Sequence, residues 1–339
     1  MGDGRSARRI TVLSSTWDGR DERAFVVRSL AGAASRVVDV DVLVPGPVGP
    51  PRADGLFDLV PIGVPEAGEI WPAIDAAMWP TTPTPDVVLF DGADGGAITL
   101  TKRFAPWATT LAVDDGRPAP TGIDQLLSVA AAPAPDGRST PVHPIGLHVP
   151  VHPLAAQRRH NGFGFTGYVL VLSDRGPTGE DHDTPSPLAA WLIAALPRHD
   201  VVVVEDGVAS AWRSRSLRGR IVIDTRTDLW RLVAHAVVTV DLGPGQLLAR
   251  ECVESLRYGI PVVVPATTAA AELAVQGGGL WYRNAAELLA CVDAVNDRKL
   301  QNTLGEQGRR FADEWYGDPD RLVERVGTVL DAVLENGQR

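Results

Sequence analysis

The stretch VVTVDLGPGQLLARECVESLRYGIPVVVP, residues 237–265, decides the fold. A β-branched run ends at Asp241, and the chain then turns through Gly243-Pro244-Gly245. A helical pattern begins near Gln246 and is stopped by Gly259, before a second buried run. A glycine-rich turn that feeds a helix presents free backbone amides and the positive end of the helix dipole, which suits a phosphate. The same turn could equally be no more than a tight connection, so the local pattern leaves both interpretations open.

The pattern continues outward on both sides of this stretch. Short β-branched runs alternate with helical patterns, which is typical of parallel sheets with crossover helices. Residues 118–153 are rich in proline and poor in periodic segments, so we interpret them as the end of one domain and the connection to the next. The sequence therefore predicts an α/β chain of two Rossmann-like domains, with a ligand crevice between them at the carboxyl ends of their strands. The expected strands are 10–13, 38–44, 86–90, 109–113, 168–172, 201–205, 220–223, 237–241 and 260–264.

Length, charge and composition exclude several classes of protein. A chain of 339 residues is long enough for two domains with a core each. A net charge of -10 leaves no basic face for a nucleic acid. Neither lysine, Lys102 or Lys299, follows a glycine, so the sequence has no P-loop. No apolar run approaches the roughly 18 residues that span a bilayer, and two cysteines fit a reducing compartment. We therefore expect a cytoplasmic protein without a transmembrane segment.

No metal site is expected. Glu180–Asp183 has residue types that bind metals, but a solvated turn is the better account of consecutive residues in a loop bounded by Gly and Pro. His143, His148 and His152 lie in the proline-rich connector, and we interpret them as structural or exposed. Residues 162–167 match GxGxxG, but they precede a strand, so these glycines do not place a dinucleotide on a helix N-terminus.

The sequence from Glu254 to Val264, ESLRYGIPVVV, resembles the EAxAxGxPVV signature of the family-4 glycosyltransferases. These are retaining enzymes with the two-domain GT-B fold. The resemblance extends in the same order over most of the chain. The other segments that match the family's pattern are 18–23, 85–90, 111–115, 145–149, 220–241, 270–281, 288–292, 304–311 and 315–316.

The resemblance implies a hexosyl-type glycosyltransferase, which moves a sugar from a nucleotide-diphosphate donor to an acceptor hydroxyl, with retention. Residues 1–160 would form the acceptor-side domain and residues 161–315 the domain that binds the nucleotide sugar. Residues 316–339 would add a C-terminal helix that could pack back on the first domain. The donor is a substrate, and no cofactor is implied. The acceptor, whether glycan, lipid or small molecule, is not encoded in these residues.

The resemblance also assigns residues to the donor. Glu254 stands where the second glutamate of the family's motif holds the ribose hydroxyls. Gln246 stands where the first glutamate faces the donor sugar. The amides of Leu247 and Leu248, directly after Gly245 and Gln246 in the glycine-rich turn, would contact the diphosphate.

Gln246 and Asp114 depart from the family's pattern, and Asp114 lies in the first domain together with a further candidate, Gly19. Gln246 carries no charge, so it could orient sugar hydroxyls but would not stabilise a developing oxocarbenium ion electrostatically. Asp114 stands where the family has a histidine. It is either a general base for the acceptor hydroxyl or the cap of the turn that follows. Gly19 lies in the loop before the first helix, where the family has a Gly-Gly loop.

The donor loop departs further. The family places an Arg and a Lys there to neutralise the leaving diphosphate, whereas in residues 173–180 only Arg175 is basic. Arg226 and Arg250 are either substitutes or ordinary surface arginines. These departures leave an alternative function open, that of a catalytically silent GT-B protein acting as partner or scaffold of an active glycosyltransferase.

Overall fold

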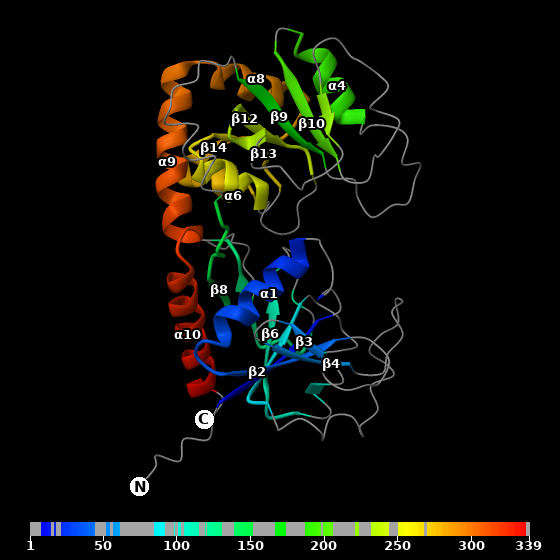
Figure 1. Cartoon of the computed structure of the whole chain (residues 1–339), viewed down its shortest axis with the longest axis vertical. Helices are drawn as coiled ribbons and strands as arrows, with labels where there is room; N and C mark the ends of the chain where they lie inside the picture. The colour runs from blue at the N-terminus through cyan, green and yellow to red at the C-terminus, as the bar shows by residue number, and fades with distance from the viewer. Residues whose placement is uncertain are drawn as a thin grey trace. The chain divides into compact units, whose positions relative to one another are not determined.

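The structure is a computed structural model of the chain. It forms two compact units, the first comprising Met1–His148 with Asp318–Arg339 and the second Val149–Gly317 (Figure 1). Each unit contains one sheet. The structure describes residues 8–14, 17, 22–44, 52–54, 57–61, 85–91, 98, 101–102, 105–114, 119, 121–130, 139–151, 167–173, 187–197, 199–205, 221–223, 232–243, 250–267 and 270–336.

The first unit is built on an eight-stranded sheet of order β3-β4-β2-β1-β5-β6-β7-β8. All neighbouring strands are parallel except the pair of β3 with β4. The central strands β1, β5 and β6 are buried apolar runs, as expected for a parallel sheet. The strand order reverses at β1, because β2 lies on one side of it and β5 on the other. The strands are β1 (Arg9–Leu13), β2 (Asp39–Val44), β3 (Arg52–Asp54), β4 (Phe57–Pro61), β5 (Val87–Phe90), β6 (Thr109–Val113), β7 (Gln125–Ser128) and β8 (Val142–Pro144).

Strands β7 and β8 lie within residues 118–153, where we expected the end of one domain and the connection to the next but no strand. They extend the first sheet in parallel beyond β6, and Ile145 N–H continues the ladder by donating to Ser128 O at 2.9 Å. Both strands are short, and β8 reads Val-His-Pro. Proline cannot donate to a ladder, and the edge position of β8 tolerates it. Segments of this length carry no alternation from which a strand could be recognised.

The C-terminal helix α10 (Pro319–Asn336) belongs to the first unit and packs against α1 (Glu22–Ala34), the two drawn red and blue in Figure 1. Arg36 forms an ion pair with Asp320 at 2.8 Å, and Arg8 pairs with Asp331 near the other end of α10. An apolar stripe at helical spacing accounts for the packing. The buried side chains of this stripe are Leu322, Val326, Val329, Leu330 and Val333.

The second unit is built on a six-stranded sheet of order β11-β10-β9-β12-β13-β14, and every neighbouring pair is parallel. Its strand order reverses between β9 and β12. The strands are β9 (Tyr168–Ser173), β10 (Val201–Glu205), β11 (Ile221–Ile223), β12 (Ala236–Asp241), β13 (Val262–Pro265) and β14 (Gly279–Tyr282). The helices are α4 (Pro187–Ala195), α6 (Arg250–Arg257), α7 (Ala271–Leu273), the π-helical turn η4 (Ala274–Gly278), α8 (Ala285–Val295) and α9 (Arg298–Tyr316).

Helix α6 ends in a Schellman motif. Gly259 has φ 68° and donates its N–H to Leu256 O at 2.7 Å, and Ile260 N–H donates to Ser255 O at 2.9 Å. Glycine takes this left-handed conformation without the steric cost of a Cβ. The motif turns the chain directly from α6 into the buried strand β13.

Helix α9 approaches this turn and the π-helical turn η4 very closely. A Cβ at Gly305 would lie 2.3 Å from the Gly259 carbonyl oxygen, and a Cβ at Gly308 would lie 2.8 Å from Gly278 Cα. Both distances are shorter than a van der Waals contact, so the backbones can approach only because these positions are glycine. Helix α6, which follows the glycine-rich turn, is thereby held between the sheet and α9.

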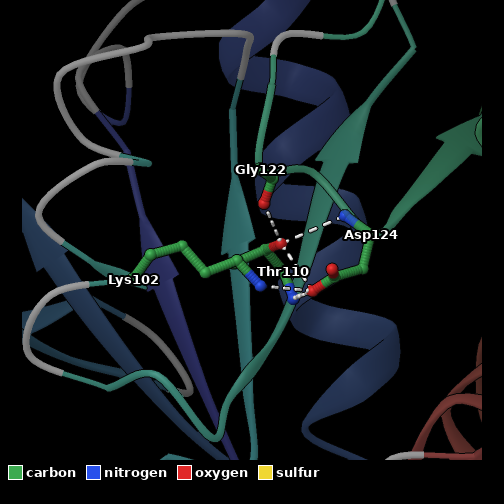
Figure 2. Close-up of polar contacts among 4 residues, drawn as sticks. All are labelled: Lys102, Thr110, Gly122 and Asp124. Atoms are coloured by element: carbon green, nitrogen blue, oxygen red, sulfur yellow. Dashed lines mark hydrogen bonds and ion pairs between the residues drawn. The ribbon is translucent and has the colours of Figure 1, made fainter.

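A polar network at the amino-terminal end of β6 holds Lys102 (Figure 2). Its Nζ donates to Asp124 Oδ2 at 2.7 Å, and Thr110 N–H donates to the same oxygen at 2.8 Å. The Thr110 hydroxyl lies 2.7 Å from the Gly122 carbonyl oxygen and 2.8 Å from Asp124 Oδ2. Burial alone would raise the pKa of Asp124, but the hydrogen bonds from Lys102 and Thr110 outweigh it and hold that pKa below its ordinary value. Lys102 thus stabilises the turn into β7, at the opposite end of β6 from Asp114.

Candidate functional site

The first part of the candidate site lies where the strand order of the second sheet reverses. Ligands of open α/β sheets bind at this place, beyond the carboxyl ends of the strands. Strand β12 ends here at the buried Asp241, whose Oδ1 accepts from Gly243 N–H at 2.9 Å. Tyr282 donates its hydroxyl to Asp241 O at 2.8 Å, and burial raises the pKa of Tyr282, so it stays a donor. Leu242 N–H donates to Leu172 O at 2.9 Å. The start of the glycine-rich turn is therefore fixed to both β9 and β14.

Helix α6 carries the second part of the site, the carboxyl group of Glu254. The helix contacts β12 and β13, and a chain of hydroxyls anchors it to β12. The Thr239 hydroxyl contacts Ser255 Oγ at 2.8 Å, and Ser255 Oγ donates to Glu251 O at 2.8 Å. Glu254 is only 8% exposed, and no residue in the described part of the chain hydrogen-bonds its carboxylate.

The charge state of Glu254 follows from this burial. Burial is the main cause that raises the pKa of Glu254 to about 7, and the neighbouring Glu251 raises it further. Arg250 and Arg257, on the same helix, act in the opposite direction. A carboxyl with this pKa exchanges its proton near neutral pH, and raised pKa values of this kind are common at functional sites.

The raised pKa of Glu254 predicts a pH dependence of stability. Between about pH 4.5 and about pH 7, Glu254 keeps its proton in the folded protein but has lost it in the unfolded chain, where its pKa is the ordinary 4.5. The free energy of unfolding should therefore fall as the pH rises from about 4.5 to about 7, and should not fall further above that pH. The total loss is on the order of 3 kcal/mol. Glu254→Gln should remove this loss. Urea unfolding of both proteins at about pH 5 and about pH 8 measures it. Parallel pH profiles of the two proteins would contradict the assignment.

A second set of polar groups lies at the carboxyl edge of the first sheet. Asp114 follows β6 and is half-buried, and its N–H donates to Leu127 O at 2.9 Å. Asp91 follows the neighbouring strand β5, is buried, and accepts from Ser14 Oγ at 3.0 Å. Ser14 follows β1, so Ser14 and Asp91 stand where the strand order of this sheet reverses. The sequence interpretation gave neither of them a role. The sequence feature that could have identified Ser14 and Asp91 is a polar residue directly after a buried strand.

The structure describes two of the predicted site residues, one in each unit. Glu254 lies on α6 of the second unit, and Asp114 lies at the end of β6 in the first. The substitute Arg250 is half-buried at the start of α6. The other predicted site residues fall outside the described residues, and their roles stay predictions. They are Gly19, Arg175, Arg226, Gly245, Gln246, Leu247 and Leu248.

Comparison with solved structures shows which fold these two sheets form. Sucrose-phosphate synthase from Thermosynechococcus elongatus superposes with a TM-score of 0.70 at 12% identity, over 97% of this chain and 100% of that one. The Anabaena protein HepE in complex with UDP-glucose superposes with a TM-score of 0.66 at 15% identity, over 96% and 99%. The chain has the GT-B fold. The lipopolysaccharide outer core galactosyltransferase WaaB has the same GT-B architecture, with a TM-score of 0.63 at 12% identity over 96% and 99%. No protein-family model and no curated protein matches the sequence.

Within the GT-B chain, the described residues contain no group of three or more His, Cys, Asp or Glu side chains that could hold a metal ion. None of the helices among them is both long and apolar enough to cross a bilayer.

Proposed function

We propose that the protein is a glycosyltransferase of the family-4 type, which transfers a sugar from a nucleotide-diphosphate donor to an acceptor hydroxyl with retention. Two kinds of observation support this. Its fold is that of GT-B glycosyltransferases, and one similar structure, HepE, was solved in complex with UDP-glucose. The stretch that resembles the family signature places a carboxyl, Glu254, on the helix that follows the reversal of strand order in the second sheet.

The observation that carries the proposal is the state of Glu254. A buried carboxylate that no described residue hydrogen-bonds is costly for the protein unless a ligand supplies donors. A carboxylate can accept two hydrogen bonds side by side, which matches the adjacent 2′- and 3′-hydroxyls of a ribose. Binding to such hydroxyls favours the ionised form, so a nucleotide would lower the pKa of Glu254 again.

The remaining assignments belong to the same proposal. Gln246, with Gly245 and the amides of Leu247 and Leu248, would orient the donor sugar and diphosphate. Arg175, with Arg226 or Arg250, would neutralise the leaving diphosphate. Asp114 would accept the proton of the acceptor hydroxyl.

The proposal places this chemistry in the cytoplasm. Cys252 and Cys291 carry free thiols, which supports a reducing compartment.

Two experiments test the proposal. Calorimetric titration with UDP, GDP and TDP shows which nucleotide binds, and incubation with labelled nucleotide sugars of that base then tests for transfer. We expect UDP to bind, and the labelled sugar to move to an acceptor in cell extract. Absence of binding by every nucleotide would contradict a donor site. Binding of UDP without turnover, in the presence of a full acceptor extract, would instead favour the catalytically silent partner.

A further inference from the structure

Arg257 joins three segments of the second unit. It lies on α6, three residues after Glu254, and its side chain is only 14% exposed. Its Nε donates to Asp313 Oδ1 on α9 at 3.2 Å, and its Nη1 donates to the carbonyl oxygen of Val149. The planar guanidinium fork serves both acceptors at once, whereas a lysine ammonium lacks this fixed fork of donors.

Val149 stands at the point where the chain leaves the first unit. The chain passes from the first unit to the second between His148 and Val149, and returns between Gly317 and Asp318. Val149 N–H donates to Tyr316 O at 2.9 Å, so the outgoing and returning segments are hydrogen-bonded to each other beside both crossings. Val149 and Tyr316 are both fully buried. The N–H and the carbonyl of Val149 are thus both bound, one to Tyr316 and the other to Arg257.

We propose that Arg257 is a positioning residue that couples the helix carrying Glu254 to the two segments through which the chain passes between its units. The family signature that this stretch resembles has alanine at this position, so the arginine is a feature of this chain. A nucleotide that orders α6 through Glu254 then also restrains Val149 and, through it, Tyr316. Segments that connect two domains absorb the backbone changes of domain motion. Through Arg257, the mobility of the segments at Val149 and Tyr316 would depend on whether a nucleotide is bound at Glu254. This coupling rests on the proposed function, because it assigns the nucleotide to Glu254.

The first experiment needs no ligand. Hydrogen exchange of the Val149 amide is compared in the wild-type protein, Arg257→Met and Arg257→Lys. Loss of the charge-assisted bond to Val149 O should accelerate exchange about tenfold in Arg257→Met, with Arg257→Lys in between. Arg310→Met is the matched control, because Arg310 is on α9 with its side chain 80% exposed. Equal exchange in wild type and both Arg257 variants would overturn the proposal.

The second experiment adds UDP, with calorimetry to measure its binding. We expect UDP to protect the Val149 amide in the wild-type protein, and to bind Arg257→Met with an affinity within several-fold of wild type but without that protection. A purely structural arginine would leave the effect of UDP intact, so equal protection in Arg257→Met would overturn the coupling. Failure of UDP, GDP and TDP alike to bind the wild-type protein would refute the proposed nucleotide site and with it the coupling, while the ligand-free exchange still decides whether Arg257 holds Val149.

Discussion

Glu254→Ala is expected to weaken UDP binding at least 100-fold. The reason is that two hydrogen bonds from ribose hydroxyls to a carboxylate are lost, each contributing about 1.5–3 kcal/mol. Calorimetry at about pH 8 measures the loss, because Glu254, whose pKa is about 7, is then ionised in the free protein. Glu254→Gln keeps one acceptor oxygen but loses the charge, so its affinity for UDP should lie between those of the wild-type protein and Glu254→Ala.

Glu306→Ala is the control for this change. Glu306 lies on α9 with its side chain 69% exposed, so removal of its charge should leave UDP binding unchanged. Wild-type affinity in Glu254→Ala would exclude Glu254 as a ribose ligand. An equal loss in both variants would point to a nonspecific effect of charge instead of a specific contact.

Gly305→Ala should destabilise the protein by up to about 2 kcal/mol net, because forcing an extra carbon into a packed site typically costs about 1–3 kcal/mol. Its Cβ would lie 2.3 Å from the Gly259 carbonyl oxygen, so α9 or the turn after α6 has to shift. Alanine is the better helix former by about 1 kcal/mol, so the measured loss is net of that gain. Urea unfolding reports the loss as a lower midpoint.

Gly327→Ala separates the clash from helix propensity. Gly327 also lies inside a long helix, α10, but a Cβ there would meet only Val37 Cγ1, at an ordinary contact distance of 3.6 Å. We expect this variant to be up to about 1 kcal/mol more stable than wild type. Stabilisation of Gly305→Ala to the same degree would show that α9 can move away from α6 at no cost.

Much of the fold could be predicted from periodicity. The central strands β1, β6, β9, β10 and β12 are β-branched or apolar runs, and they lie within one residue of the ranges expected from the sequence. The strands that were missed are β3, β4, β7, β8 and β14. Strands β3, β7 and β8 mix polar and apolar residues over three or four positions, and β14 begins in a glycine run, so none of these four is a continuous apolar run like β5 or β11. Their pairing with neighbouring strands, which is a nonlocal interaction, determines their conformation.

The candidate site was predictable only where a motif exists. Glu254 could be singled out because its spacing to Gly259 and Pro261 matches a family signature. Asp91 and Ser14 belong to no motif, and only the order of strands in the sheet brings them together. Arg257 departs from the family signature, but its contact with Val149 could not be predicted, because Val149 is far away along the chain.

The packing of α10 on α1 has a consequence for the order in which the protein is synthesised and folded. Helix α1 is synthesised before the second unit, and its partner α10 is synthesised after that unit. At about 5–20 residues per second, the apolar face of α1 that α10 covers waits roughly 15 to 60 s for its cover. The second unit, from Val149 to Gly317, is by then fully synthesised. The first unit can therefore be completed only after the second, and the apolar face of α1 stays uncovered in the meantime.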